Sequence, residues 1–250
     1  KYRSWIPESY PIHASDTQKE TEHDLTLLLG KNLEDFEKHS SDNWDEKIIS
    51  INSNLIGSDG WDDLDQIFYV LNATTNYVVL RNYEELVETK NIPIDDIDLF
   101  SESIEDLEFI INPKKIKGKE KFYYHAKVGS DEIIFDFQHV SDNHYDKQWS
   151  KDILSRRIFY KNKFYVPNDE DHFYSLLYHA LYHKNHISDN YQKKFFELSA
   201  KLHISEVTSN FFFDEQNSKN LLFIFMKKMN YSLPHEKFLE KSTNIFDTVK

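Results

Sequence analysis

The chain has 250 residues, of which 39% are hydrophobic and 15% aromatic, and it contains no cysteine. Such a chain can bury a substantial core in one large or two modest domains, and the lack of cysteine excludes disulfides and thiolate metal sites. Its five glycines form neither a Walker A loop nor a dinucleotide-binding fingerprint, and its net charge of −13 argues against broad binding to a nucleic-acid backbone.

The sequence shows no sign of a membrane segment or a leader. It has no apolar run of about 18 residues and no signal-peptide pattern. We therefore expect a cytoplasmic protein without a membrane span. Because residue 1 is a lysine, we also expect this chain to be a piece of a longer, multidomain polypeptide.

Residues 1–50 are mostly polar and carry two short predicted elements. Ser15 or Asp16 can cap a helix that contains a run of leucines, and Gly30 is a natural stop for it. Residues 48–51 form a short strand candidate. We predict that residues 1–50 form a helical and irregular appendage to the main domain.

Apolar residues recur at helical spacing over residues 61–71. They are Trp61, Leu64, Ile67, Phe68 and Leu71. Ser58 or Asp59 precedes them as a cap, and Asp62 and Asp63 lie in the expected first turn, where negative charge suits the helix dipole. The pattern predicts an amphipathic helix that leads directly into a strand.

Two apolar runs then enclose a polar turn and a helical-looking piece. Residues 77–80 predict a strand that stops at Arg81 and Asn82, and a second apolar run carries Asp96 and Asp98. If that run is a strand, the two carboxylates share one face, because side chains alternate along a strand.

The next elements are a helix and a hairpin. Ser103 is a suitable cap for a helix that Pro113 stops. Two β-rich runs, residues 122–128 and 132–140, flank a Gly-Ser-Asp turn and predict a hairpin. Asp136 lies in the middle of the apolar run in the second arm. A carboxylate is unusual in such a run unless it has a partner or a function.

The composition becomes helical from about residue 149. A short β-like piece over residues 157–166 precedes a helix that starts at residues 167–169 and carries one apolar stripe. Two further helices are expected over residues 191–203 and 219–229. We place a domain boundary between a core of residues 51–148 and a mostly helical C-terminal domain of residues 149–250.

Three carboxylates on neighbouring strands can hold one or two Mg²⁺ ions, because Mg²⁺ prefers oxygen ligands and keeps substrate phosphates in its shell. Asp96, Asp98 and Asp136 are the candidates. Each also has a simpler interpretation: the first two as surface carboxylates of an acidic segment, and the third as a polar residue of an edge strand. Arg81 is open to a structural ion pair with Asp96 or Asp98.

Residues 61–140 resemble the polymerase-β-like nucleotidyltransferases, in particular the uncharacterised bacterial type. In that superfamily a Gly-Gly or Gly-Ser turn after the first strand binds triphosphate, an Asp-x-Asp pair follows, and a third carboxylate comes from a later strand. Here Asp96 and Asp98 match the pair and Asp136 matches the third carboxylate. Arg81 and Asn82 stand where the glycines are expected, so phosphate would meet a guanidinium in place of backbone N–H groups.

The resemblance implies an α+β fold, with a nucleotidyltransferase-like mixed sheet, flanking helices and a helical C-terminal domain. It also implies a transferase that uses Mg²⁺ or Mn²⁺ to move a nucleoside monophosphate from a nucleoside triphosphate such as ATP to a hydroxyl acceptor. The acceptor, whether small molecule, glycan or protein, is left open. Asp96, Asp98 and Asp136 would hold the metal and carry the catalysis, and Arg81 with Asn82 would bind the phosphates.

The first C-terminal helix carries a second group of candidates. His179 and His183 have the i, i+4 spacing that a zinc pair uses, but no glutamate stands beside them as in a His-Glu-x-x-His motif. Related transferases have a similar helical segment that lines the cleft. On that resemblance His179, His183 and Lys184 contact the donor phosphate or the acceptor, and ordinary packing is the alternative.

Two other functions remain open on the same fold. The missing glycines allow a phosphosugar or polyol-phosphate donor, which would make the chain a transferase of surface-glycan synthesis. They also allow a transferase-like module that has lost catalysis and binds a partner.

Overall fold

This computed structural model describes residues 15–38, 50, 52, 54–88, 96–118, 122–184, 187–208 and 215–232. The predicted strand at residues 48–51 falls almost wholly outside these ranges. The described part is a mixed α+β structure with a central sheet and many helices, as expected. None of its helices is both long and apolar enough to cross a bilayer.

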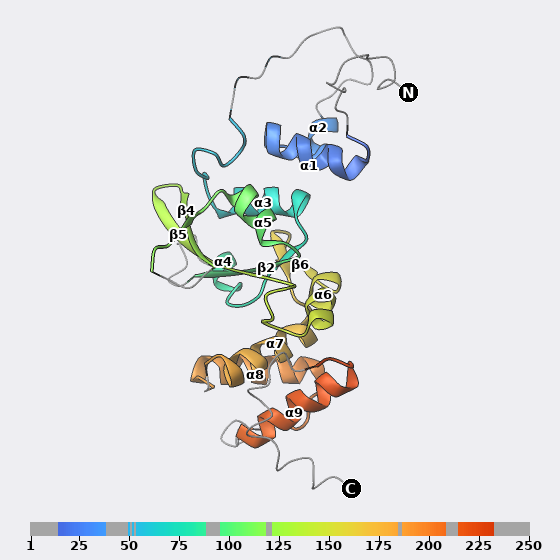
Figure 1. The fold of residues 1–250 in the computed structure, drawn as a ribbon. Helices are drawn as coiled ribbons and strands as arrows, with labels where there is room; N and C mark the ends of the chain where they lie inside the picture. The colour runs from blue at the N-terminus through green and yellow to red at the C-terminus, as the bar shows by residue number, and fades with distance from the viewer. Residues whose placement is uncertain are drawn as a thin grey trace.

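Helices pack on both sides of the sheet. They are α1 (Gln18–Leu29), α2 (Leu33–Glu37), α3 (Leu64–Thr74), α4 (Glu85–Glu88), α5 (Ile104–Ile111), α6 (Lys147–Ser155), α7 (Asp169–Tyr182), α8 (Asp189–Leu202) and α9 (Glu215–Lys228). Figure 1 shows them in layers: α1 and α2 at one end, α3 and α5 against the sheet, and α7, α8 and α9 at the other end.

Five strands form one mixed sheet. They are β1 (Tyr77–Val79), β2 (Ile97–Ser101), β3 (Lys114–Lys115), β4 (Tyr123–Val128) and β5 (Asp131–His139). The spatial order is β1-β2-β5-β4-β3, and every neighbouring pair is antiparallel except β2 and β5, which run parallel. The predicted hairpin is confirmed as β4 and β5.

The two faces of this sheet meet different partners because side chains alternate along β2 and β5. Leu99, Phe135 and Phe137 are fully buried in a cluster with residues of α3 and α5. Phe100 and Val140 belong to a second apolar cluster, which is built mainly from α6, α7, α8 and α9. The sheet therefore joins two hydrophobic cores.

A second, two-stranded sheet follows α6. Its strands are β6 (Ile158–Tyr160) and β7 (Phe164–Val166), which confirms the β-like piece expected there. Phe164 and Val166 are buried in the cluster on the α3 side of the main sheet. The hairpin after α6 thus packs on the core that precedes it, although the division at residue 148 remains a prediction.

The predicted helix over residues 61–71 is correct in type but wrong at its start. It begins at Leu64, where the side chain of Asp63 accepts a hydrogen bond from Gln66 N at 2.8 Å. Trp61 lies in an isolated bridge with Val128, and its indole N–H donates to Ile111 O at 3.0 Å. Helical spacing alone could not separate this buried tryptophan from the helix, because its partners are distant in sequence.

The other helix ends follow from their capping residues. Ser103 caps α5 as expected, and Gly30 ends α1 in the left-handed conformation. The cap of α7 is Asn168, within the expected start at residues 167–169. The cap of α1 is Thr17, so the prediction of Ser15 or Asp16 was wrong by one or two residues. Thr17 Oγ1 accepts a hydrogen bond from Glu20 N at 3.1 Å, which fixes the start of the helix.

Candidate functional site

Two of the three candidate carboxylates lie side by side on the parallel strand pair. Asp98 of β2 and Asp136 of β5 are register partners, so their side chains leave the same face of the sheet at neighbouring positions. Asp98 is only 5% exposed, and Asp136 is partly buried. This face is turned toward the C-terminal helices, because Phe100, two residues after Asp98, packs in their cluster.

Asp96 lies directly before β2 and completes the carboxylate group. It is partly buried, and its negative charge raises the pKa values of both Asp98 and Asp136. Burial and the negative charges of Asp136 and Asp96 raise the pKa of Tyr123 of β4, which is the register partner of Asp136. The three aspartates therefore form one electrostatic group. The strand begins at Ile97, so it carries Asp98 but not Asp96, and the expectation that both lie on one strand is wrong for Asp96.

Gln138 adds an amide to the same face. It follows Asp136 by two residues on β5, is 5% exposed, and its Nε2 lies 3.4 Å from Asp136 Oδ2. Its Oε1 is buried and has no hydrogen-bond partner in the described part of the chain. A buried carbonyl oxygen without a donor is expensive, and a cation would satisfy it.

The carboxylate group is short of positive charge. Burial raises the pKa of Asp136 to about 7, and the nearby charge of Asp98 contributes to the rise. Burial also raises the pKa of Asp98, and the guanidinium of Arg81 opposes that rise. Carboxylates crowded in this way lose their charge unless a cation shares the site.

Arg81 supplies one such cation. It follows β1, is 6% exposed, and its Nε donates to Asp98 Oδ2 at 3.1 Å while Nη2 pairs with Oδ1 of the same carboxylate. Its Nη1 lies 3.1 Å from Nδ1 of His179, on α7. The ion pair with Asp98, one of the alternatives that the sequence left open, is therefore present, and it ties β1, β2 and α7 together.

Asn82 does not join this group. Its side chain is exposed, and its backbone adopts the left-handed conformation with φ of 54°. Asparagine tolerates this region better than most residues that carry a Cβ. Asn82 thus makes a turn that a glycine would also make, and the guanidinium beside it points inward to Asp98.

Two of the three residues predicted on the C-terminal helix lie near Arg81. His179 is 8% exposed and contacts Arg81, while His183, the C-cap residue of α7, is exposed. Burial and the charge of Arg81 lower the pKa of His179 to about 2. Although His183 as a whole is exposed, its ring packs beside those of His144 and His179, and this partial desolvation, together with the charge of Arg81, lowers its pKa to about 4. Lys184 is exposed, and its charge lowers the pKa values of both histidines and of Asp98.

Some residues of this region were not predicted from the sequence. His144, from the loop between β5 and α6, has its ring centroid 4.2 Å from that of His183, and Gln138 and Tyr123 flank the carboxylates. Gln138 could have been found, because it shares the alternation of Asp136 along one strand. His144 could not, because its loop has no period that predicts where a side chain lies.

A cavity of about 490 Å³ lies elsewhere, between α1, α3 and the β6–β7 hairpin. Tyr69, Asn72 and Lys163 are among its lining residues, and none of the candidate aspartates lines it. The cavity is therefore separate from the carboxylate group.

Comparisons with protein-family models, with curated proteins and with solved structures give no match for this chain.

Proposed function

We propose that the chain is a metal-dependent nucleotidyltransferase that moves a nucleoside monophosphate from a nucleoside triphosphate to a hydroxyl acceptor. The observation that carries this proposal is the pairing of Asp98 and Asp136 on adjacent parallel strands, with Asp96 at the entrance to β2. Three carboxylates in one electrostatic group are a suitable ligand set for Mg²⁺ or Mn²⁺.

The residues present fit such an ion. The donor atoms are carboxylate oxygens, and the buried Oε1 of Gln138 lacks a donor among the described residues. The raised pKa of Asp136 reflects burial and uncompensated negative charge. A bound divalent ion would neutralise phosphate charge and orient the phosphate for in-line attack.

Asp136 is the residue that we assign to proton transfer. Arg81 pairs with the neighbouring carboxylate of Asp98, which leaves Asp136 as the strand carboxylate that is better placed to accept a proton. In this proposal an Oδ atom of Asp136 accepts the proton of the acceptor hydroxyl as the hydroxyl oxygen attacks the α-phosphorus. The bond from the α-phosphorus to the bridging oxygen breaks, and pyrophosphate leaves. Asp98 is held on the same face by Arg81, so the two carboxylates keep a fixed relative position.

Arg81 and Lys184 are the cations that we assign to the phosphates. His179 positions the guanidinium of Arg81 through its contact with Nη1. Because the guanidinium already pairs with Asp98, phosphate binding requires it to share or leave that carboxylate. His183 and Lys184 are exposed at the end of α7, where a ligand can reach them.

The proposal is tested by nucleotide binding and turnover. Mn²⁺ with each of ATP, CTP, GTP and UTP should raise the melting temperature for at least one nucleotide, and Asp96→Asn or Asp136→Asn should remove the shift. Asp131→Asn is a matched control, because Asp131 lies on the same strand but is exposed at its far end. The absence of any response to all four nucleotides would contradict the proposal.

The second candidate is a transferase-like module without catalysis. It is favoured by the Arg81–Asp98 ion pair, because the guanidinium takes the charge-neutralising place beside Asp98. The two functions differ in turnover: an inactive module would bind nucleotide without releasing pyrophosphate, and its affinity would survive Asp136→Asn. Turnover of CDP-linked donors without turnover of free triphosphates would instead indicate a polyol-phosphate transferase.

A further inference from the structure

We propose that His144, His179 and His183 form a second metal site, for a transition-metal ion of the Zn²⁺ class, beside the carboxylate group. Three imidazoles converge here from two separate elements. One ligand atom from each residue lies within 4.8 Å of the others. His179 and His183 are four residues apart at the end of α7, and His144 reaches them from the loop after β5.

The three rings lie close to one another, and an ion between them requires their rearrangement: the ring centroids of His144 and His183 are only 4.2 Å apart. The ring centroids of His179 and His183 are 5.3 Å apart, and the rings of His144 and His183 are inclined at 70°. Ligand nitrogens around a tetrahedral zinc ion lie roughly 3.4 Å apart, because each Zn–N bond is about 2.0–2.1 Å long. The ligand atoms, which lie within 4.8 Å of one another, must therefore shift by up to about 1.4 Å to reach this separation. His183, exposed at the end of its helix, can supply this movement by turning its side chain.

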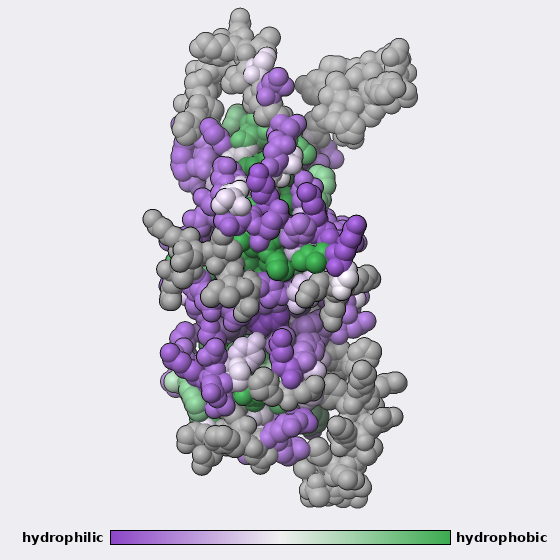
Figure 2. All heavy atoms as spheres, turned by 90° about the vertical axis from the view of Figure 1, so that its left-hand side faces the viewer, coloured by the Kyte–Doolittle hydropathy of each residue, from purple (hydrophilic) through white to green (hydrophobic). Residues whose placement is uncertain are grey.

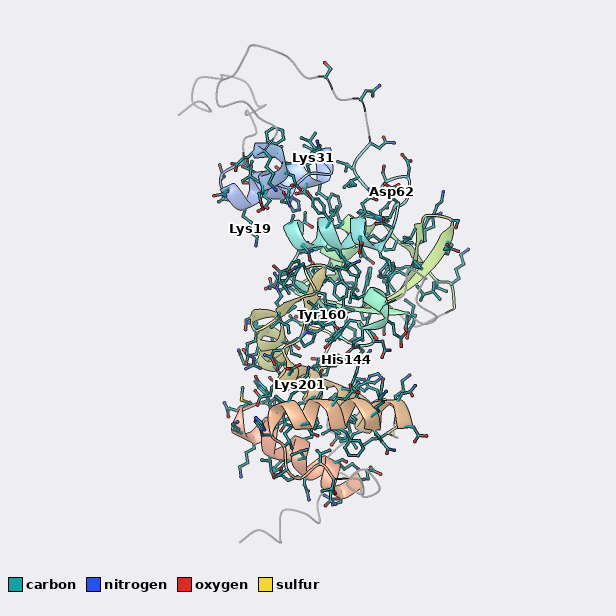
Figure 3. The ribbon with its side chains drawn as sticks, turned by 180° about the vertical axis from the view of Figure 1, so that it is seen from behind. Lys19, Lys31, Asp62, His144, Tyr160 and Lys201 are labelled. Carbon is teal, nitrogen blue, oxygen red and sulfur yellow. The ribbon has the colours of Figure 1, made fainter. Side chains whose placement is uncertain are left out.

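The second observation is a buried ring nitrogen of His144. Nε2 of His144 is buried and has no hydrogen-bond partner among the described residues. In Figure 3 the labelled His144 lies between the sheet and the C-terminal helices. A buried polar atom is normally satisfied, and a metal ion would satisfy this one.

The surroundings of the three side chains favour the neutral imidazole, which is the form that binds a metal. Burial lowers the pKa of His144 well below its usual range, with a further contribution from His183. Burial likewise lowers the pKa values of His179 and His183, to about 2 and about 4. Neutral imidazoles are ligands of Zn²⁺, Cu²⁺ and Ni²⁺, and three of them leave a further coordination position open.

A metal ion bound to His179 and the contact between His179 and Arg81 exclude each other. A neutral imidazole has a single free lone pair, and that of His179 faces Nη1 of Arg81 at 3.1 Å. A metal ion bound to His179 would take the lone pair and displace the guanidinium. The positive charges of Arg81 and the metal would also repel each other, so Arg81 should weaken metal binding.

The test is a Co²⁺ titration of the untagged chain, in millimolar Mg²⁺ to occupy the carboxylates. We expect one Co²⁺ per chain, with the strong visible bands of low-coordinate cobalt, and displacement by Zn²⁺. His183→Gln should weaken binding at least tenfold, and it should preserve the fold because His183 is exposed. His144→Gln should have the same effect, whereas His125→Gln, on β4, should have none.

The absence of these bands in the wild-type chain would overturn the proposal, and so would wild-type affinity in both His183→Gln and His144→Gln. A second measurement tests the exclusion. The double variant Arg81→Gln with Asp98→Asn removes the guanidinium without leaving a charged carboxylate unpaired, and it should bind Co²⁺ severalfold more tightly. Unchanged or weaker binding would contradict the competition with Arg81. None of these readouts depends on nucleotide transfer.

Discussion

The two faces of the central sheet are made by the same strands, but Asp98 and Asp136 both lie on one of them. On β5, Phe135 and Phe137 are fully buried against α3 and α5, while Asp136 between them faces the C-terminal helices. On β2, Leu99 and Asp98 divide in the same way. One face therefore stabilises the fold by apolar burial, and the other combines apolar residues such as Phe100 with charge that the fold must compensate.

The buried charges of this face differ from the charges on the surface of the molecule. Figure 2 shows a side of the molecule on which hydrophilic residues predominate, with a small hydrophobic area midway along it. The carboxylate group is not part of that solvated surface, since Asp98 and Arg81 are 5% and 6% exposed. Charges that are buried in this way are costly, which is why we assign them a function rather than a role in solubility.

The largest effect is expected on the apolar face. Phe137→Ala should lower the free energy of unfolding by about 3–5 kcal/mol, because it opens a cavity in a fully buried cluster. Ile134→Ala, on the same strand but 42% exposed, should change it by less than about 0.5 kcal/mol. Urea denaturation measures both. Equal losses would mean that the two faces of β5 do not differ as described.

The buried ion pair should come next. Arg81→Met should cost roughly 3 kcal/mol, because Asp98 would remain buried without its partner. Adding Asp98→Asn should recover part of this loss, which a double-mutant cycle in urea would reveal. Lys163→Met removes the exposed pair with Asp65 and should cost about 1 kcal/mol or less. If the losses of Arg81→Met and Asp98→Asn were additive in the double variant, Arg81 and Asp98 would not be coupled.

A smaller effect is expected from the pH dependence of stability. Because the folded protein raises the pKa of Asp136 to about 7, it binds this proton more tightly than the unfolded chain does. The contribution of Asp136 to stability is therefore full below about pH 4 and is lost as the pH rises through 7. Asp136→Asn should remove roughly 2 kcal/mol of that decline, allowing for partial exposure of the carboxylate.

Urea denaturation of the wild type and the variant at pH 4 to 8 measures this difference. Asp131→Asn is the control on the same strand and should retain the wild-type decline. If Asp136→Asn and the wild type declined in parallel over this range, Asp136 would not be the group responsible.

The smallest effect is expected at the turn after β1. Asn82 has φ of 54°, so Asn82→Ala should cost about 1 kcal/mol, the strain of a left-handed residue with a Cβ. Asn82→Gly should change the free energy of unfolding by less than about 0.5 kcal/mol, because glycine adopts this conformation without strain. Thermal unfolding compares the two. A costly Asn82→Gly would show that the asparagine side chain itself is needed.

Much of the fold follows from local rules. Ser103 and Asn168 predict helix starts because a cap acts on a backbone N–H three residues away. The shared face of Asp98 and Asp136 follows from strand alternation once both strands are recognised. Trp61 misled the prediction because its apolar spacing matched the helix, whereas its indole hydrogen-bonds to Ile111, fifty residues away.

The rest depends on contacts between distant segments. Arg81 and His179 are separated by 98 residues, and His144 lies in a loop that no periodic pattern describes. The sequence allowed an ion pair of Arg81 with either Asp96 or Asp98, and only the arrangement of β1 beside β2 distinguishes them. The residues of the carboxylate group could therefore be predicted, but not the way in which Arg81 compensates their charge.

The most direct test is a crystal of the chain soaked with Mn²⁺ and a non-hydrolysable nucleoside triphosphate. The proposal predicts an anomalous difference peak between the carboxylates of Asp96, Asp98 and Asp136, with the triphosphate beside it, and no such peak in Asp136→Asn. Nucleotide bound without a peak at these carboxylates, or a manganese peak only at the histidines, would contradict it.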